Sequence, residues 1–175
     1  MNKTVIKCTL DANSIDKAIK ELDRYKRKFL KKVDTYRKRI AEEIAVNASI
    51  NFGSSIVNDV IKGGSSRRAN VEVMVGDDGA IAVVVAYGED AVWCEFGAGV
   101  YHNGSVGSSP NPYGKELGFT IGSYGKGYGS RKAWGYKDEN GDLIITRGTP
   151  ASMPMYNAAQ EVARKSIEIA REVFG

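Results

Sequence analysis

The longest uninterrupted pattern of apolar and polar residues is helical and covers residues 14–52. No Gly or Pro interrupts this segment, and Asp11 and Asn13 precede it as candidate N-caps. Apolar side chains recur every three or four residues, which places them on one face of a helix. The first part of this stripe approaches a seven-residue repeat, and the second part is rich in alanines that permit close packing. The stripe consists of Ile15, Ile19, Leu22, Phe29, Val33, Tyr36, Ile40, Ala41, Ile44, Ala45, Ala48 and Phe52.

This helix is long for a chain of 175 residues. At a rise of about 1.5 Å per residue it extends about 55 Å, whereas a compact domain of this size has a radius of gyration of about 16 Å. Two arrangements fit these lengths. Either the helix bends back onto its own sheet, or its first half projects and its apolar stripe packs against a neighbouring subunit as in a coiled coil.

Two shorter segments flank the helix. Residues 4–10 alternate, with Ile6, Cys8 and Leu10 on one side of the chain, and this period of two predicts a strand. After the helix, the apolar residues within 56–61 predict a short helical turn.

Two hairpins are predicted in the remainder. Residues 71–75 and 80–86 flank a turn with Gly at each end, and the second strand is almost continuously apolar, which is typical of a central strand. Residues 133–136 and 143–146 flank Asn140-Gly141, a preferred type I′ turn.

Residues 97–130 lie between the hairpins and are rich in Gly, Ser, Asn, Tyr and Pro. A non-periodic stretch of this length is uncommon within a compact domain, so we predict a mobile loop that orders on docking. Its aromatic side chains are suited to an interface. These candidate interface residues are Tyr101, Tyr113, Phe119, Tyr124 and Tyr128.

A last helix is predicted from about Ser152 to Phe174. The order of elements predicts the α+β class, with a single domain over residues 1–175. In this domain a mainly antiparallel sheet packs against the long N-terminal helix and the C-terminal helix.

The net charge of +4 is unevenly distributed. From Lys17 to Arg39 there are 11 Lys and Arg against 3 Asp and Glu, which gives +8 and leaves −4 for the rest of the chain. This basic segment is either a solvated helix face or a surface for a polyanion or an acidic neighbour. Its candidate contact residues are Lys26, Lys31 and Lys38.

The sequence contains neither an apolar run of membrane-spanning length nor a signal-peptide pattern, so we expect a protein that is made and used in a cytoplasm, without membrane contact. The two cysteines, Cys8 and Cys94, form no C-x-x-C pair and are expected to be ordinary buried thiols on apolar strand faces.

Candidate chemistry is sparse. Cys94 and His102, the single histidine, are the obvious nucleophile and base, but the Gly-rich stretch between them gives little to fix their geometry. Residues 125–130 resemble a phosphate loop but lack the Walker spacing. We therefore expect no catalysis, no cofactor and no metal site.

Two segments together resemble the minor capsid or tail-completion proteins of long-tailed phages and prophages. The first is a hydrophobic-E-F-G-(T/A)-G string, here Trp93 to Gly99, which the family places at the end of a strand. The second is a Pro-Phe-(Met/Leu)-x-x-Ala string that opens the last helix, here Pro154 to Ala159, with Met155 in place of Phe. A W-x-Y hairpin between them matches Trp134-Gly135-Tyr136. The residues that match the family motif and are candidates for its interfaces are Glu95, Phe96, Gly97, Trp134, Tyr136, Pro154 and Met155.

The resemblance implies a structural virion protein. Such a protein assembles as a ring, often of six copies, at the head-proximal end of the tail and joins the tail to the head connector. Its partners would be further copies of itself, a connector or stopper protein, the tail tube protein and passing DNA. It would reside in the neck region of the virion, and in the host cytoplasm during assembly.

Two alternatives come from other classes. A non-specific nucleic-acid-binding protein would use the basic helix at residues 17–39, where aromatic and cationic side chains are interleaved. A thiol hydrolase would use Cys94.

Overall fold

The computed structural model describes residues 5–99, 109–117 and 133–175. Its three helices are α1 (Ala12–Ser54), α2 (Asp90–Phe96) and α3 (Pro154–Phe174). Its strands are β1 (Ile56–Val57), β2 (Val60–Lys62), β3 (Arg67–Arg68), β4 (Glu72–Asp77), β5 (Ala82–Tyr87), β6 (Ala98–Gly99), β7 (Trp134–Lys137), β8 (Leu143–Thr146) and β9 (Gly148–Thr149). The predicted α+β class is confirmed, and the long basic helix, both hairpins and the C-terminal helix are present.

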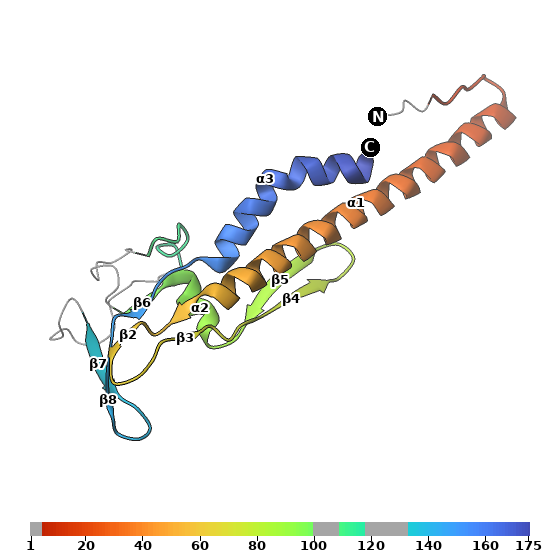
Figure 1. Ribbon diagram of the computed structural model, residues 1–175. Coiled ribbons are helices and arrows are strands. Elements are labelled where there is room, and N and C mark those ends of the chain that lie inside the picture. Colours follow the sequence, from red (N-terminus) through yellow and green to blue (C-terminus); the bar gives the residue numbers. More distant parts are fainter. Residues whose placement is uncertain (1–4, 100–108, 118–132) are drawn as a thin grey trace.

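The molecule is elongated along α1 (Figure 1). Helix α3 and the β4–β5 hairpin both pack against α1, and the small strands gather around its C-terminal end (Figure 1). With 43 residues, α1 is about 65 Å long. Its N-cap is Asp11, whose side chain accepts a hydrogen bond from the Ser14 N–H at 2.9 Å.

The part of α1 before Phe29 projects beyond the end of α3 (Figure 1). Helix α3 ends at Phe174, whose ring lies 5.8 Å from that of Phe29 and 6.0 Å from that of Tyr36. The buried residues of α1 all belong to its second half, where Ala41, Ala45, Ala48 and Phe52 face the domain. The structure therefore shows a projecting helix, and the packing of its stripe against a neighbouring subunit stays a prediction.

The strands form four small antiparallel sheets rather than one. They pair as β1–β3, β2–β8–β7, β4–β5 and β6–β9. Among the described residues β5 has β4 as its single neighbour, so the prediction that β5 is central in a sheet is wrong for this chain on its own.

Two local predictions are also wrong. Residues 56–61 form β1 and β2 instead of a helical turn, because Asn58 adopts positive φ (55°) between them and each short strand finds a pairing partner. Val5–Leu10 is irregular, and all of it but the half-buried Ile6 is exposed, because α1 holds it far from every described strand. Cys8 is accordingly exposed and not on a packed strand face.

The core lies where the C-terminal end of α1 meets α2 and the start of α3. Phe52, Val57, Ala91 and Cys94 form a buried cluster. Met155, the first-turn residue that replaces Phe in the family string, packs against this cluster. The prediction that Cys94 is a buried packing residue is confirmed, although it lies on a helix rather than a strand.

Candidate functional site

The two family-like strings meet at one carboxylate, that of Glu95. Glu95 is 9% exposed and lies on α2, which corrects the expectation that its string ends a strand. Gly97 ends this helix with φ of 84°, a conformation that glycine accommodates at a helix C-terminus. The string E-F-G therefore ends a helix. The glycine in the sequence could have indicated this, because glycine is common at helix C-termini.

The Glu95 carboxylate caps helix α3. Met153 precedes α3 in a left-handed conformation and offers no side-chain cap, and Pro154 has no N–H. Glu95 instead accepts hydrogen bonds from the N–H groups of Met155 at 2.8 Å and Tyr156 at 3.0 Å. An anion at a helix N-terminus also interacts favourably with the helix dipole. Burial raises the pKa of the Glu95 carboxyl, and these hydrogen bonds oppose the rise.

A second contact between the two strings is the β6–β9 pairing, in which Ala98 lies opposite Thr149 and Gly99 opposite Gly148. Gly148 has φ of 95°, and a Cβ there would lie 2.1 Å from the carbonyl oxygen of Ala98. Only glycine fits such a close approach of two backbones. Together with Glu95, this pairing forms what we call the Glu95 joint: residues 95–99 and 148–156.

Residues 109–117 contact the Glu95 joint. Asn111 is 3% exposed and donates from Nδ2 to Glu95 Oε1 at 2.8 Å, and Ser109 Oγ donates to the Phe96 carbonyl at 2.8 Å. The Tyr113 ring lies 6.2 Å from that of Tyr156, edge to face, and the side chain is 54% exposed. Within the predicted loop at 97–130, the described residues 109–117 thus contact Glu95 and Phe96 of α2. Sequence analysis missed Asn111 because nothing in its own segment shows periodicity.

The other predicted loop residues, Tyr101, Phe119, Tyr124 and Tyr128, lie outside the described residues, as does His102. That the loop is mobile stays a prediction.

Trp134 and Tyr136 lie on β7, and the Trp134 indole borders the Glu95 joint, because a Cβ added at Gly99 would lie 2.9 Å from Trp134 Nε1. Their rings are 5.5 Å apart, and they are 41% and 36% exposed. The Tyr136 hydroxyl accepts a hydrogen bond from Asn58 Nδ2 at 2.8 Å. Among the residues that match the family motif, these two have large side chains that are exposed. Tyr113, from the predicted loop interface, is exposed as well.

The projecting part of α1 presents an uncovered apolar stripe. Ile15, Ile19 and Leu22 are 40%, 52% and 55% exposed. They continue, at spacings of four and three residues, the face on which Phe29 and Val33 lie. In this repeat Lys26 occupies a core-type position between Leu22 and Phe29, where a single charged residue is known to fix register in coiled coils.

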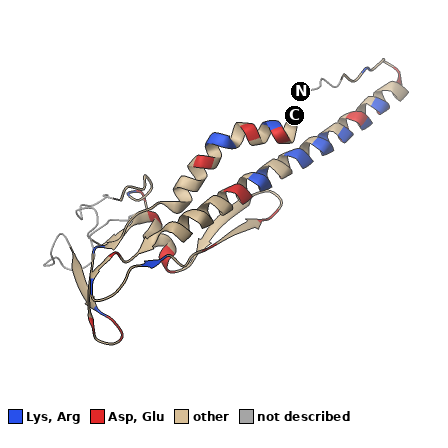
Figure 2. Ribbon diagram, in the orientation of Figure 1, with Lys and Arg blue, Asp and Glu red and all other residues tan. Residues whose placement is uncertain are grey.

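Cations are concentrated along this projecting part, whereas α3 mixes both signs (Figure 2). Lys26 and Lys31 are exposed, and within the described residues no acidic side chain lies within ion-pairing distance of either. They remain available to a partner.

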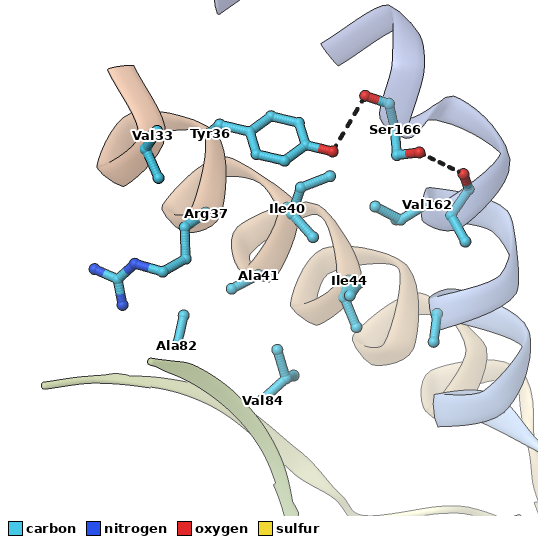
Figure 3. Close-up of a pocket in the computed structure, with 12 residues that line it drawn as sticks. Val33, Tyr36, Arg37, Ile40, Ala41, Ile44, Ala82, Val84, Val162 and Ser166 are labelled. Atoms are coloured by element: carbon cyan, nitrogen blue, oxygen red, sulfur yellow. Dashed lines mark hydrogen bonds between the residues drawn. The ribbon is translucent and has the colours of Figure 1, made fainter. Parts of the chain in front are cut away.

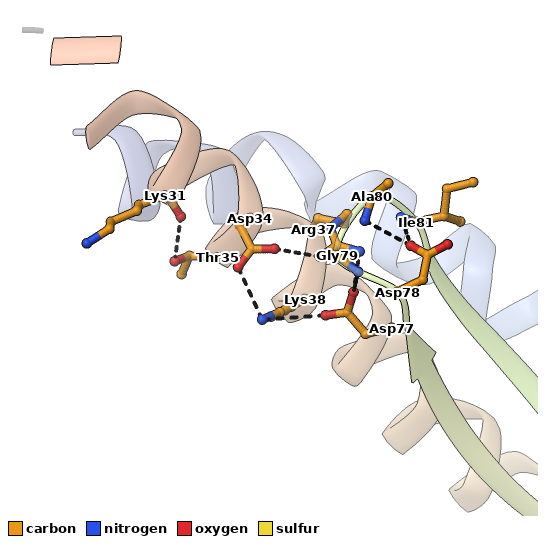
Figure 4. Close-up of polar contacts among 10 residues, drawn as sticks. All are labelled: Lys31, Asp34, Thr35, Arg37, Lys38, Asp77, Asp78, Gly79, Ala80 and Ile81. Atoms are coloured by element: carbon orange, nitrogen blue, oxygen red, sulfur yellow. Dashed lines mark hydrogen bonds and ion pairs between the residues drawn. The ribbon is translucent and has the colours of Figure 1, made fainter. Parts of the chain in front are cut away.

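Lys38 differs, because it pairs within its own chain. Its Nζ lies 3.1 Å from Asp34 Oδ2 and 3.5 Å from Asp77 Oδ2, at the tip of the β4–β5 hairpin (Figure 4). Arg37 bridges the same two carboxylates at 2.5 Å and 2.6 Å. The hydrogen bond from Arg37, with that from the Gly79 N–H, lowers the pKa of Asp77 to about 2. This network fixes the hairpin to α1.

Cys94 is poorly suited to act as a nucleophile. Cys94 is fully buried, and burial raises the pKa of its thiol to about 11, which disfavours the nucleophilic thiolate. No cluster of three or more metal-ligating side chains occurs in the ranges 5–99, 109–117 and 133–175. In those same ranges no helix is long and apolar enough to cross a membrane.

Comparison with known proteins gives no match to this chain, whether against family models, curated proteins or solved structures.

Proposed function

We propose that this protein is a structural subunit of a long-tailed phage or prophage. In this proposal it assembles into a ring at the head-proximal end of the tail and joins the tail to the head connector. It has no catalytic role. Its neighbours in the virion are further copies of itself, the connector or stopper protein and the tail tube protein, and it assembles in the host cytoplasm.

The observation on which the proposal mainly rests is the uncovered apolar stripe of α1. Ile15, Ile19 and Leu22 precede Phe29, the α1 residue whose ring lies against Phe174 at the end of α3, and contiguous exposed apolar surface of this kind is typical of protein interfaces. A helix that projects from one side of a subunit can contact a different surface of its neighbour, and such heterologous contacts close into rings when the rotation permits.

The Glu95 joint gives independent support. The strings Glu95-Phe96-Gly97 and Pro154-Met155, which carry the resemblance to tail-completion proteins, are far apart in sequence but contact each other directly. If each string needs the other for its local structure, the two strings are expected to occur together in the same protein.

Self-association of the stripe can be measured by sedimentation velocity. We expect the wild-type protein to sediment as a multimer and the variant Ile19→Gln/Leu22→Gln to sediment as a folded monomer, since the change removes apolar contact area without touching the domain core. The matched control, Lys17→Gln/Arg24→Gln, alters the opposite face of the same helix turns and should remain a multimer. A monomeric wild type, or equal assembly of both variants, would contradict the proposal.

A second candidate function is non-specific binding of nucleic acid by residues 17–39. The unpaired cations Lys26 and Lys31 favour it, because free cations on an exposed helix attract phosphates. In that case the monomeric variant Ile19→Gln/Leu22→Gln should still bind duplex DNA, with an affinity that falls steeply as salt rises. Failure to bind at low salt would exclude this function.

A further inference from the structure

Strand β5 has the sequence of a strand buried on both faces but lies in a two-stranded sheet. Ala82, Val84 and Ala86 face α1, and the opposite face exposes Val83 and Tyr87 at 49% and 53%. Near-continuous apolar strands of this kind are typical of the interior of a sheet. Within the described residues, however, the edge of β5 away from β4 has no pairing strand.

An apolar groove of about 400 Å³ adjoins this free edge. It is lined by α1, α3 and β5, with Ala82 and Val84 directed into it from below and Tyr36, Ile40 and Val162 around it (Figure 3). Arg37 lies at its margin and is held by Asp34 and Asp77, so the groove floor itself is uncharged. A strand added to β5 would place alternate side chains into this groove.

The segment Val5–Leu10 has the sequence pattern of a strand but pairs with no described strand. Its alternation is that of a strand, with Ile6, Cys8 and Leu10 on one side, but it is irregular, with Ile6 half-buried, Cys8 exposed and Leu10 fully exposed. It contains six residues, as β5 does. Among the described residues, the chain therefore contains both a strand-like segment without a pairing strand and a strand edge without a neighbour.

The two cannot meet within one copy. Val33, the groove residue closest to the start of α1, is 21 residues from Ala12, about 32 Å along the helix. Val5 lies seven residues from Ala12, and even a fully extended chain spans at most about 25 Å over that distance. The segment therefore reaches a β5 edge only on another copy.

We infer that Val5–Leu10 of one copy adds as a strand to the free edge of β5 in a neighbouring copy, with Ile6, Cys8 and Leu10 in the groove. This inference rests on the proposed assembly into a ring, and it names the contact that passes from each copy to the next. The projecting half of α1 is then the arm that delivers the strand.

Disulfide trapping tests the contact, because Cys8 supplies one thiol and its partner can be placed on either face of β5. Ala82→Cys and Val84→Cys put a thiol on the groove side, and Val83→Cys puts it on the outer side. Under mild oxidation, one or both groove-side variants should form a ladder of covalently linked copies on a non-reducing gel. Val83→Cys should not, and adding Cys8→Ser should abolish the ladder.

The outcomes separate this inference from the proposed function. A wild type that is multimeric by light scattering, but whose groove-side variants form no ladder or link no better than Val83→Cys, overturns the strand addition and leaves ring assembly in place. A wild type that stays monomeric overturns both.

A second measurement does not depend on a new thiol. Ile6→Asp should weaken the self-association constant about tenfold or more, since it places a charge in an apolar groove. Lys7→Asp, on the other face of the segment, should change it about twofold at most. Equal effects of the two substitutions would overturn the inference.

Discussion

At the scale of single residues, Glu95 shows what a short sequence string does in the fold. Its carboxylate is used three times within its own chain, by Met155, Tyr156 and Asn111. It therefore acts as an internal cap for α3. Among the candidate interface residues, Tyr113, Trp134 and Tyr136 are exposed.

Glu95→Ala should destabilise the protein by about 2–4 kcal/mol, because it removes the cap of α3 and leaves the buried Asn111 amide without its acceptor. Glu95→Gln retains an acceptor oxygen and should cost less. Glu89→Ala serves as control, since Glu89 is exposed and makes no capping hydrogen bond. Denaturant unfolding measures all three, and equal midpoints for Glu95→Ala and Glu89→Ala would contradict the capping role.

Asn111→Ala should cost about 1–3 kcal/mol, the range for loss of a buried hydrogen bond to a charged group. The same unfolding experiment tests it. A change below about 0.5 kcal/mol, typical of exposed sites, would show that residues 109–117 are not part of the folded core.

At the scale of elements, the long periodic segments were predictable and the short ones were not. The α1 stripe, the α3 helix and both hairpins follow from periodicity and from turn residues such as Asn140-Gly141. Strands β1, β2, β6 and β9 have two or three residues each and exist because distant segments pair with them, which no local pattern encodes. Glu95, Asn111 and Asp77 belong to the site for the same reason: their partners are remote in sequence.

The contact between α1 and the β4–β5 hairpin should depend on pH through Asp77. Its pKa falls from 3.8 to about 2 in the folded protein, mainly through Arg37. A lowered folded-state pKa stabilises the protein above the unfolded value, and the gain is lost as pH falls toward about 2. The difference in unfolding free energy between wild type and Asp77→Asn should therefore shrink as pH drops from about 5 to about 2. A difference that stays constant would show that the pair contributes nothing.

Lys26 interrupts the apolar repeat of α1 at a core-type position. It should therefore lower the stability of the assembly and fix the register of the paired helices. Lys26→Leu should strengthen self-association and broaden the range of multimer sizes in native mass spectrometry. Lys28→Leu, a nearby exposed lysine outside the stripe, is the matched control and should do neither. Identical size distributions for both variants would place Lys26 outside any helix seam.

At the scale of the whole molecule, three parts of the described chain have no partner within it. Among the described residues, the part of α1 before Phe29 has no apolar partner, β5 has no neighbour on one edge, and Val5–Leu10 has no strand to pair with. Each deficiency lies at a different position on an elongated subunit, so a single repeated contact between copies can satisfy all three. A head-to-tail arrangement of this kind closes into a ring or continues as a filament.

Electron microscopy of the purified protein tests ring assembly most directly. The account predicts closed rings with one fixed number of copies and an open centre, which disappear in the variant Ile19→Gln/Leu22→Gln. Monomers, two-fold symmetric dimers or open filaments in the wild type would contradict it.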